Sequence, residues 1–438
     1  MLDIKFIIEN REAVEKSIAM RHVTADLDAV IAAYDRFRET KQALEEKQAE
    51  ANQVAKTISK ADPAERPALI ERGSALKAET STLGEKLAGY EAEFQELMLT
   101  VPNTLPDDTP EGKDDQANIE IRKFMEPPRV NFKQKDHIEL GKSLDLIDFE
   151  GGAKVAGAKF YFLKNEAVLL EMALQHFAFK KAIERGFIPL QTPDLARNDV
   201  LQGAGFAPRG NESNTYRIED QDLSLVATAE IPVGGLHANE ILPEEALPLR
   251  YVAWSHCFRT EAGAAGQASK GLYRVHQFSK VELYAFTTPE QSAAVHEEML
   301  ELEESIYQDL KIPYRVVRIC AGDLGAPAWK KYDIEAWMPG KGENGEYGEI
   351  TSASNCTDFQ ARRLNVRYKD KASGKNRFVH TLNGTAIAMS RTPIAILENY
   401  QTDRGTVIVP EVLRPVMGID EIFPKNGAVA DATQKAAG

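Results

Sequence analysis

Cysteine is scarce in this chain of 438 residues, which contains only Cys257, Cys320 and Cys356. The three lie far apart, no CxxC pair occurs, and no two histidines stand at the spacing of metal ligands. The sequence therefore argues against both a disulfide framework and a zinc site. We expect reduced thiols that are mostly buried.

Long apolar runs are also missing. The first residues, MLDIKFIIENREAVEK, carry acids and bases too early for a signal peptide, and no run approaches the roughly 20 residues that a membrane-spanning helix needs. We therefore expect no membrane association and a cytoplasmic location.

Positive charge is in deficit, since 53 Lys and Arg residues face 67 Asp and Glu residues and the formal net charge is -14. Taken alone, this balance argues against a nucleic-acid partner. A large enzyme, however, needs a basic surface only where it contacts the nucleic acid. The hydrophobic share of 43% is ordinary for a globular protein, and the length allows about two or three domains.

One stretch, residues 258–286, has the pattern of a β-hairpin. An apolar run ends at Phe258-Arg259, small and flexible residues follow from Gly263 to Gly271, and an alternating run extends from Leu272 to Phe286. The period of two predicts a single strand face that carries Arg274, His276, Phe278, Lys280 and Glu282. Because unpaired charges are costly to bury, this mixture favours a nucleotide ligand bound through phosphates, base and an ammonium or hydroxyl group.

The N-terminal region predicts two long helices packed against each other. After a short helical segment over residues 1–26, apolar residues recur at alternating spacings of three and four, which is typical of a coiled-coil seam. Asp62-Pro63 and Pro67 interrupt the pattern with a turn. The two predicted seams are Leu27, Val30, Tyr34, Phe37, Lys41, Leu44, Gln48, Ala51, Ala55 and Ile58, and then Leu69, Gly73, Leu76, Thr80, Leu83, Leu87, Tyr90, Phe94 and Leu97.

Such an arm of about 30 residues a side buries little besides its own seam. It can serve as a dimerisation coiled coil or as a probe that contacts a partner. Basic residues lie toward the tip, whereas the base of the second helix is acidic, and this asymmetry favours a nucleic-acid contact at the distal half. The candidate contacts are Lys56, Lys60, Arg66, Arg72 and Lys77.

The region after the polar linker, which ends near residue 118, predicts a mixed α and β domain. We expect helices over residues 165–185 and 291–310, the second as a solvated outer cover, and an edge strand over residues 187–194 that its prolines limit. Strands are predicted over 315–319 and 332–338, with an exposed loop over 340–348. Ser390 and Pro393 predict the start of a further helix, and residues 426–438 a disordered tail.

Several ordered segments together resemble the class II aminoacyl-tRNA synthetases, and among them the bacterial-type seryl-tRNA synthetases. Phe258-Arg259-x-Glu261 and Arg274-Val275-His276-Gln277-Phe278 are similar to the second signature motif of that class. The resemblance covers nearly the whole chain and includes Thr228 to Glu230, Tyr332 to Glu335, Glu349 to Asn355, Asp358 to Arg363, His380 to Thr385, and Arg391 through Glu398 to Gln401. Thr351 and Ala353 differ from the residues that are usual in bacterial members of the family, at positions where the family varies.

This resemblance implies ATP as substrate with Mg²⁺ as the metal. Activation of an amino acid is an in-line attack of its carboxylate on the α-phosphorus, which requires positioning and charge neutralisation. The implied ATP contacts are Arg259, Glu261, Arg274, Val275, Phe278, Glu349, Ser352 and Arg391, with Arg259, Arg274 and Arg391 as the catalytic arginines. Glu349 and Ser352 are the implied magnesium ligands.

The resemblance also implies a pocket for L-serine. Glu282 and Thr385 would read the serine hydroxyl, Thr228 and Glu230 would hold the ammonium group, Asn383 would support the wall, and Arg259 would bind the carboxylate. A site that hydrogen-bonds a hydroxyl strongly rejects an analogue that lacks it, such as alanine.

The implied fold is α+β, with a class II catalytic domain on an antiparallel β-sheet flanked by helices and an antiparallel coiled-coil hairpin at the N-terminus. The expected domains are a tRNA-binding arm with its linker over 1–118, the catalytic domain over 119–425, and the tail. A homodimer is implied, as are tRNA(Ser) and, where the organism has one, tRNA(Sec) as partners. Two alternatives stay open, namely a paralogue that loads a carrier protein and a non-catalytic tRNA-binding protein.

Overall fold

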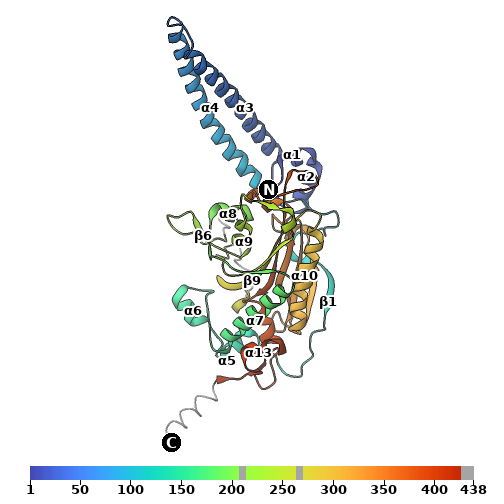
Figure 1. The fold of residues 1–438 in the computed structure, drawn as a ribbon. Helices are drawn as coiled ribbons and strands as arrows, with labels where there is room; N and C mark the ends of the chain where they lie inside the picture. Colours follow the sequence, from blue (N-terminus) through green and yellow to red (C-terminus); the bar gives the residue numbers. More distant parts are fainter. Residues whose placement is uncertain (207–213, 263–269, 426–438) are drawn as a thin grey trace. The chain divides into compact units, whose positions relative to one another are not determined.

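The computed structural model of the chain describes residues 1–206, 214–262 and 270–425 (Figure 1). It divides into two compact units, Met1–Thr104 and Leu105–Gly438. We placed the division at residue 118, but residues 105–118 pack within the second unit, where the N–H groups of Ala321 and Gly322 donate to the carbonyls of Pro110 and Gly112. The predicted tail over 426–438, and most of the glycine-rich connection of the hairpin, lie outside the described residues.

The first unit is the predicted helical arm. Short helices α1 (Ile4–Glu9) and α2 (Arg11–Met20) precede the two long ones, α3 (Leu27–Ile58) and α4 (Arg66–Thr100), which run side by side in opposite directions (Figure 1). Asp26 caps α3 by accepting from the N–H of Ala29, and proline occupies the first turn of α4. Lengths of 32 and 35 residues confirm the predicted hairpin.

The seam of the arm follows the prediction on α4 and departs from it on α3. All nine predicted α4 positions are shielded from solvent, with Leu76 and Phe94 buried. On α3 the prediction was wrong by one residue at three positions, since Lys41, Gln48 and Ala55 are exposed. The preceding residues Thr40, Lys47 and Val54 are the more buried ones instead. The seam thereby gains the larger apolar side chain of Val54 in place of Ala55, and the amide of Gln48 stays in water.

The second unit is built on an eight-stranded sheet. Its strand order is β1-β10-β11-β12-β15-β9-β8-β4, and every neighbouring pair is antiparallel except β4 with β8. This confirms the predicted antiparallel sheet with 187–194 at its edge. The bounds are β1 Ile119–Phe124, β10 Tyr314–Arg318, β11 Lys330–Met338, β12 Glu346–Asn355, β15 His380–Ala388, β9 Gln277–Thr287, β8 Leu249–Phe258 and β4 Ile188–Gln191.

The two faces of the sheet have different roles, as β9 shows by its alternation. Val281, Leu283 and Ala285 belong to the main core, which the helices α7 (Glu166–Glu184), α10 (Ser292–Asp309) and α12 (Thr392–Asn399) complete. Tyr284 and Phe286 point to the other face and join a smaller core with α9 (Glu230–Leu236) and α11 (Phe359–Leu364). The charged residues of β9, Lys280 and Glu282, lie on this second face.

Smaller elements complete the second unit. They are the helices α5 His137–Ser143, α6 Phe149–Ala156, α8 Asn198–Ala204 and α13 Arg414–Met417, and the strands β2 Ile147–Asp148, β3 Phe162–Leu163, β5 Leu195–Arg197, β6 Leu223–Leu225, β7 Ile241–Pro243, β13 Arg367–Lys369, β14 Asn376–Phe378, β16 Val407–Ile408 and β17 Glu421–Ile422. Among the helices of the three described ranges, none has the length and apolarity that crossing a membrane requires.

Several local predictions were wrong. The helix α10 is more deeply packed than a solvated cover, since His296 and Glu303 are buried, although Ala294, Glu298, Glu301 and Gln308 leave one stripe of it exposed. The helical spacing in α7 predicts Leu169 and Met172 among its core-facing apolar positions, but they are 42% and 58% exposed, and Leu170 and Leu174 face the core instead. The segment 340–348 is not wholly a loop, since its last residues belong to β12.

Candidate active site

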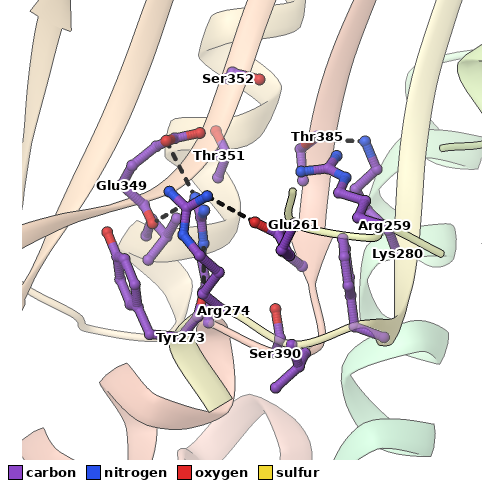
Figure 2. A pocket seen from close by; sticks show the side chains of 15 residues that line it. Arg259, Glu261, Tyr273, Arg274, Lys280, Glu349, Thr351, Ser352, Thr385 and Ser390 are labelled. Carbon is purple, nitrogen blue, oxygen red and sulfur yellow. Dashed lines mark hydrogen bonds and ion pairs between the residues drawn. The ribbon is translucent and has the colours of Figure 1, made fainter. Parts of the chain in front are cut away.

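A cavity of about 250 Å³ opens on the second face of the sheet, lined by β9, β12 and β15 together with the segments that follow β8 and precede α12 (Figure 2). All eight predicted ATP contacts line it, although they come from segments more than 100 residues apart. They are Arg259, Glu261, Arg274, Val275, Phe278, Glu349, Ser352 and Arg391, and Thr385 of the predicted serine pocket joins them.

The ends of β8 and β9 form one wall of the cavity. The guanidinium of Arg259 lies 5.2 Å from the ring centroid of Phe278, and Arg274 donates to the Glu261 carboxylate at 2.7 Å. The backbone of Glu261 has φ of 54°, in the left-handed region that costs a non-glycine residue about 1 kcal/mol. Strain of this kind persists where the surrounding structure fixes a side chain for use, and Glu261 is directed into the cavity.

The opposite wall pairs β12 with the start of α12. Arg391 Nη1 lies 3.2 Å from the Glu349 carboxylate, donates to the Glu349 carbonyl at 3.1 Å, and its guanidinium covers the Tyr273 ring at 4.8 Å. Burial alone would raise the pKa of the Glu349 carboxyl, but the cations of Arg391 and Lys331 outweigh it and hold that pKa at about 2. Glu349 is therefore an anion at neutral pH.

A β-bulge at Ile350 sets the side-chain directions on β12. Glu349 pairs with Glu335 and Ser352 with Asp333, so the extra residue keeps Glu349 and Ser352 on the same sheet face. The carboxylate and the hydroxyl both line the cavity, and the Glu349 side chain keeps 40% exposure there. Without the bulge, strict alternation would turn Ser352 toward the core.

Behind the cavity lies a layer of buried polar groups that contains the other predicted serine contacts. Glu230 accepts from Asn383 at 2.8 Å and from Gln360 at 2.7 Å, and its own N–H donates to the Thr228 hydroxyl. Burial, and then the neighbouring Glu282 carboxylate, raises the pKa of Glu230 to about 7. Lys280 and Arg259 offset this rise only in part, and such a carboxylate is suited to receive an ammonium group.

Glu282 and Thr385 form the second part of this layer. They stand directly opposite each other on β9 and β15, and the Thr385 hydroxyl donates to the Glu282 carboxylate at 3.4 Å. Lys280 forms a buried ion pair with the same carboxylate. The structure thus brings Thr228, Glu230, Glu282 and Asn383 beside the cavity without making them part of its lining.

The predicted face of β9 was only partly right. The strand begins at Gln277, after a 3₁₀ turn over Gly271–Tyr273, so alternation does not govern Arg274 and His276. His276 turns away from the ligand side, because its Nδ1 binds the Arg259 carbonyl at 2.8 Å and its ring stacks on Phe160. Ser390 lines the cavity but does not cap α12, whose N-cap is Arg391.

Other lining and supporting residues were given no role by the sequence. Tyr273 and Thr351 line the cavity, and Gln360 binds Glu230. Gln360 lies in the recognised segment 358–363, and that membership was its only signal. Tyr273 had none, because its position depends on the turn that replaces the predicted strand.

The candidate tRNA contacts on the arm fall into two groups. Lys56, Lys60, Arg66 and Lys77 are exposed, and no ion pair of theirs occurs among the described residues. Arg72 is different, because it donates to Glu50 on the facing helix and lies 3.8 Å from Glu79. The two carboxylates thus partly neutralise the Arg72 charge within the arm.

Family models match both units of the chain. The model described as the tRNA synthetase class II core domain (G, H, P, S and T) matches residues 215–400, and the seryl-tRNA synthetase N-terminal domain matches residues 1–105. Among similar proteins, the serine–tRNA ligase of Treponema denticola is 52% identical over 96% of this chain and 100% of its own. That of Rhodopirellula baltica is 55% identical over 96% of this chain and 99% of its own.

Solved structures agree with these matches. A seryl-tRNA synthetase from Pyrococcus horikoshii complexed with ATP superposes with a TM-score of 0.86 at 40% identity, covering 97% of this chain and 100% of that one. A cytoplasmic serine–tRNA ligase from Naegleria fowleri in complex with AMP gives 0.81 at 34% identity, covering 97% and 99%. The chain belongs to the seryl-tRNA synthetase family of class II aminoacyl-tRNA synthetases.

Proposed function

We propose that this protein activates L-serine with ATP to seryl-adenylate and transfers the serine to tRNA(Ser). One observation carries the proposal, which is the convergence of three cavity arginines and an anionic Glu349 beside a buried layer of acids and hydroxyls. The first set suits a polyphosphate, and the second suits a small zwitterion with a hydroxyl group.

In the activation step the serine carboxylate attacks the α-phosphorus of ATP in line, and pyrophosphate leaves. Arg259 is placed to neutralise the serine carboxylate and the α-phosphate together, because its planar fork can bridge two oxyanions. Arg274 and Arg391 receive the terminal phosphates, Phe278 stacks on the adenine, with the Val275 backbone beside it, and Glu261 accepts from its exocyclic amine. Arg274 donates to the same Glu261 carboxylate, so the adenine amine and this guanidinium share one acceptor.

Glu349 and Ser352 are the residues that would hold Mg²⁺. An ionised carboxylate beside a hydroxyl on one wall suits a hard cation, whose remaining ligands would be phosphate oxygens and water. No cluster of three acidic, histidine or cysteine side chains that could hold a metal occurs within the described ranges, and the proposed site needs none. When bound, the ion would neutralise phosphate charge during the displacement.

Serine selection rests on the buried layer. Glu230 and Thr228 would hold the ammonium group, and Asn383 fixes the Glu230 carboxylate by donating to it. Glu282 and Thr385 would bind the hydroxyl, which alanine lacks. The arm would contact tRNA(Ser), and also tRNA(Sec) where that tRNA exists, through its basic distal half.

Exposed apolar side chains on α7 and β4 support a homodimer. Leu169, Met172, Ile183 and Ile188 are 42%, 58%, 47% and 45% exposed, and a second copy would cover them. Because tRNA charging supplies protein synthesis, we propose the cytoplasm as the location of this protein. A carrier-protein paralogue would have no use for the long arm, and a non-catalytic protein would have no need of the charged cavity.

The decisive experiment is ATP–pyrophosphate exchange with serine, threonine, alanine and cysteine, for the wild type and for Arg259→Ala. Exchange with serine alone that is lost in the variant is the expected result. Absence of exchange with every amino acid would favour the non-catalytic alternative, and exchange with a different amino acid would overturn the roles of Glu282 and Thr385. Charging of tRNA(Ser) then separates the synthetase from the carrier-protein paralogue.

A further inference from the structure

A buried cation stands between the two groups that we assign to the serine hydroxyl. Lys280 on β9 is 6% exposed and lines the cavity, its ammonium pairs with the Glu282 carboxylate, and Nζ lies 3.5 Å from the Thr385 hydroxyl. Figure 2 shows Lys280 and Thr385 pointing toward each other beside Arg259. The three polar groups therefore touch pairwise, with Thr385 in turn 3.4 Å from Glu282.

The strand register provides the room for this cation. On β8, Ala253 faces Glu282 and Ser255 faces Lys280, and on β15 Ala388 faces Lys280. These small side chains leave the Lys280 stem buried among strands with its ammonium beside Glu282. A buried lysine is costly unless it is paired, so its presence here indicates a role in the pocket.

Several charged groups surround Glu282. Glu230 approaches from α9, Arg259 from the end of β8, Glu303 from α10 and Lys280 from β9 itself. Burial raises the pKa of the Glu282 carboxyl, and Lys280 opposes this rise more than Arg259 does. If Glu282 took up a proton, it could no longer serve as a charged acceptor for a hydroxyl.

We propose that Lys280 is a positioning residue that determines serine specificity, because its ammonium fixes the Glu282 carboxylate beside Thr385 as the acceptor for the serine hydroxyl. This rests on the proposed function. Lys280 acts through Glu282, and its removal affects amino-acid recognition while ATP recognition stays intact. Alanine has no hydroxyl for Glu282 to accept from. The weak activation of alanine should therefore be the same with and without Lys280.

The test is pyrophosphate exchange by full-length Lys280→Met, Lys280→Arg, Glu282→Gln and the double variant Lys280→Met/Glu282→Gln. Methionine keeps the length of the stem and removes the charge. We expect Lys280→Met to raise KM for serine at least tenfold and to leave KM for ATP within twofold. The preference for serine over alanine should fall by a similar factor, and Lys280→Arg, which keeps the charge, should restore part of it.

A pH profile and the double variant separate this role from a merely structural one. Without Lys280 the pKa of Glu282 is higher, so the acid limb of kcat/KM for serine should move to higher pH in Lys280→Met and stay in place in Lys280→Arg. Because Lys280 acts through Glu282, the double variant should be no worse than Glu282→Gln. Additive losses, or an unmoved acid limb with unchanged KM for serine, would overturn the inference.

Two controls keep the outcome readable. Lys280→Met leaves the Glu282 carboxylate buried without its partner, and this can prevent folding; the double variant removes that carboxylate. If Lys280→Met does not fold, the comparison of the double variant with Glu282→Gln tests the role of Lys280. Stabilisation by ATP, measured as a shift in Tm, reports the integrity of the nucleotide site in every variant. Failure of the wild type to exchange with serine would overturn the proposed function, whereas an active wild type with an unaffected Lys280→Met would overturn only the role of Lys280.

Discussion

The arm and the cavity use charged residues in opposite ways. In the arm, Lys47 pairs with Glu79 and Arg72 with Glu50, and all four side chains keep 36% to 45% exposure. In the cavity unit, Lys280 and Glu282 pair with 8% and 3% exposure. Exposed pairs contribute about 0 to 1 kcal/mol, whereas removing one member of a buried pair costs about 3 to 5 kcal/mol.

The comparison shows that the effect of a charged side chain on stability and binding depends on how exposed it is. Water screens the arm charges, so each one is replaceable and their sum matters for a polyanion such as tRNA. The cavity charges are few and mutually dependent, and Lys280 and Glu282 among them are buried, so each fixes a particular neighbour. Variants in the two units should accordingly differ in both the size and the kind of their effects.

The largest effect is expected from Arg391→Ala. This change removes a cation from the proposed phosphate site and leaves Glu349 without its partner. We expect exchange kcat/KM to fall by about 10² to 10³, the usual loss for one preorganised charge donor. The matched control is Arg404→Ala, because the Arg404 side chain is 62% exposed and its loss should change exchange kcat/KM by less than about twofold. Similar losses in both variants would break the contrast between buried and exposed charge.

The next effect concerns the pH dependence of stability. The folded pKa of Glu230, about 7, lies above its ordinary value of 4.5, so its contribution is full below pH 4.5 and lost as pH rises through 7. The difference corresponds to about 3 kcal/mol. We therefore expect Glu230→Gln to unfold at higher urea than the wild type at pH 8 and to match it at pH 4. The exposed Glu219→Gln should show no such change.

The sequence was sufficient for elements with strong local signals. The arm helices needed only their 3-4 spacing and the Pro63 and Pro67 turn, and the site needed a set of motifs that occur in order along the chain. All eight predicted ATP contacts, which line one cavity, could be named because each belongs to such a motif. Their convergence on one cavity could not be derived from spacing, since it depends on the strand order of the sheet.

The failures have physical causes of the same kind. Alternation places side chains correctly only within a continuous strand, and the 3₁₀ turn before Gln277 removed His276 from the site. In α7, both faces carry apolar residues, so periodicity could not identify the buried one. The helix α10 reads as acidic, yet Glu303 is buried against Thr351, and only the tertiary fold reveals such a pairing. The sequence placed Lys280 on the predicted face, but it did not predict the contacts of Lys280 with Glu282 and Thr385.

A smaller effect, confined to tRNA, is expected at the tip of the arm. Replacing Lys56, Lys60, Arg66 and Lys77 together by glutamine removes four exposed charges. We expect tRNA(Ser) affinity to fall about tenfold and the salt dependence of log Kd to flatten by up to roughly 3, because fewer counterions are released. Exchange with serine should be unchanged, and Lys86→Gln nearer the base of α4 serves as the control. An unchanged salt slope would exclude the tip as a tRNA contact.

The smallest effect should come from Arg72→Gln, which tests whether an exposed ion pair withdraws a charge from binding. Its guanidinium already faces Glu50 and Glu79, so phosphate would have to compete with two carboxylates. We expect a smaller loss of tRNA affinity than for Lys60→Gln, and no measurable change in the Tm of the protein, because water screens an exposed ion pair. Adding Glu50→Gln to the wild type should release the charge and strengthen tRNA binding. A loss at Arg72 equal to that at Lys60 would mean that exposed pairing leaves a charge fully available, and the contrast with the cavity would then rest on burial alone.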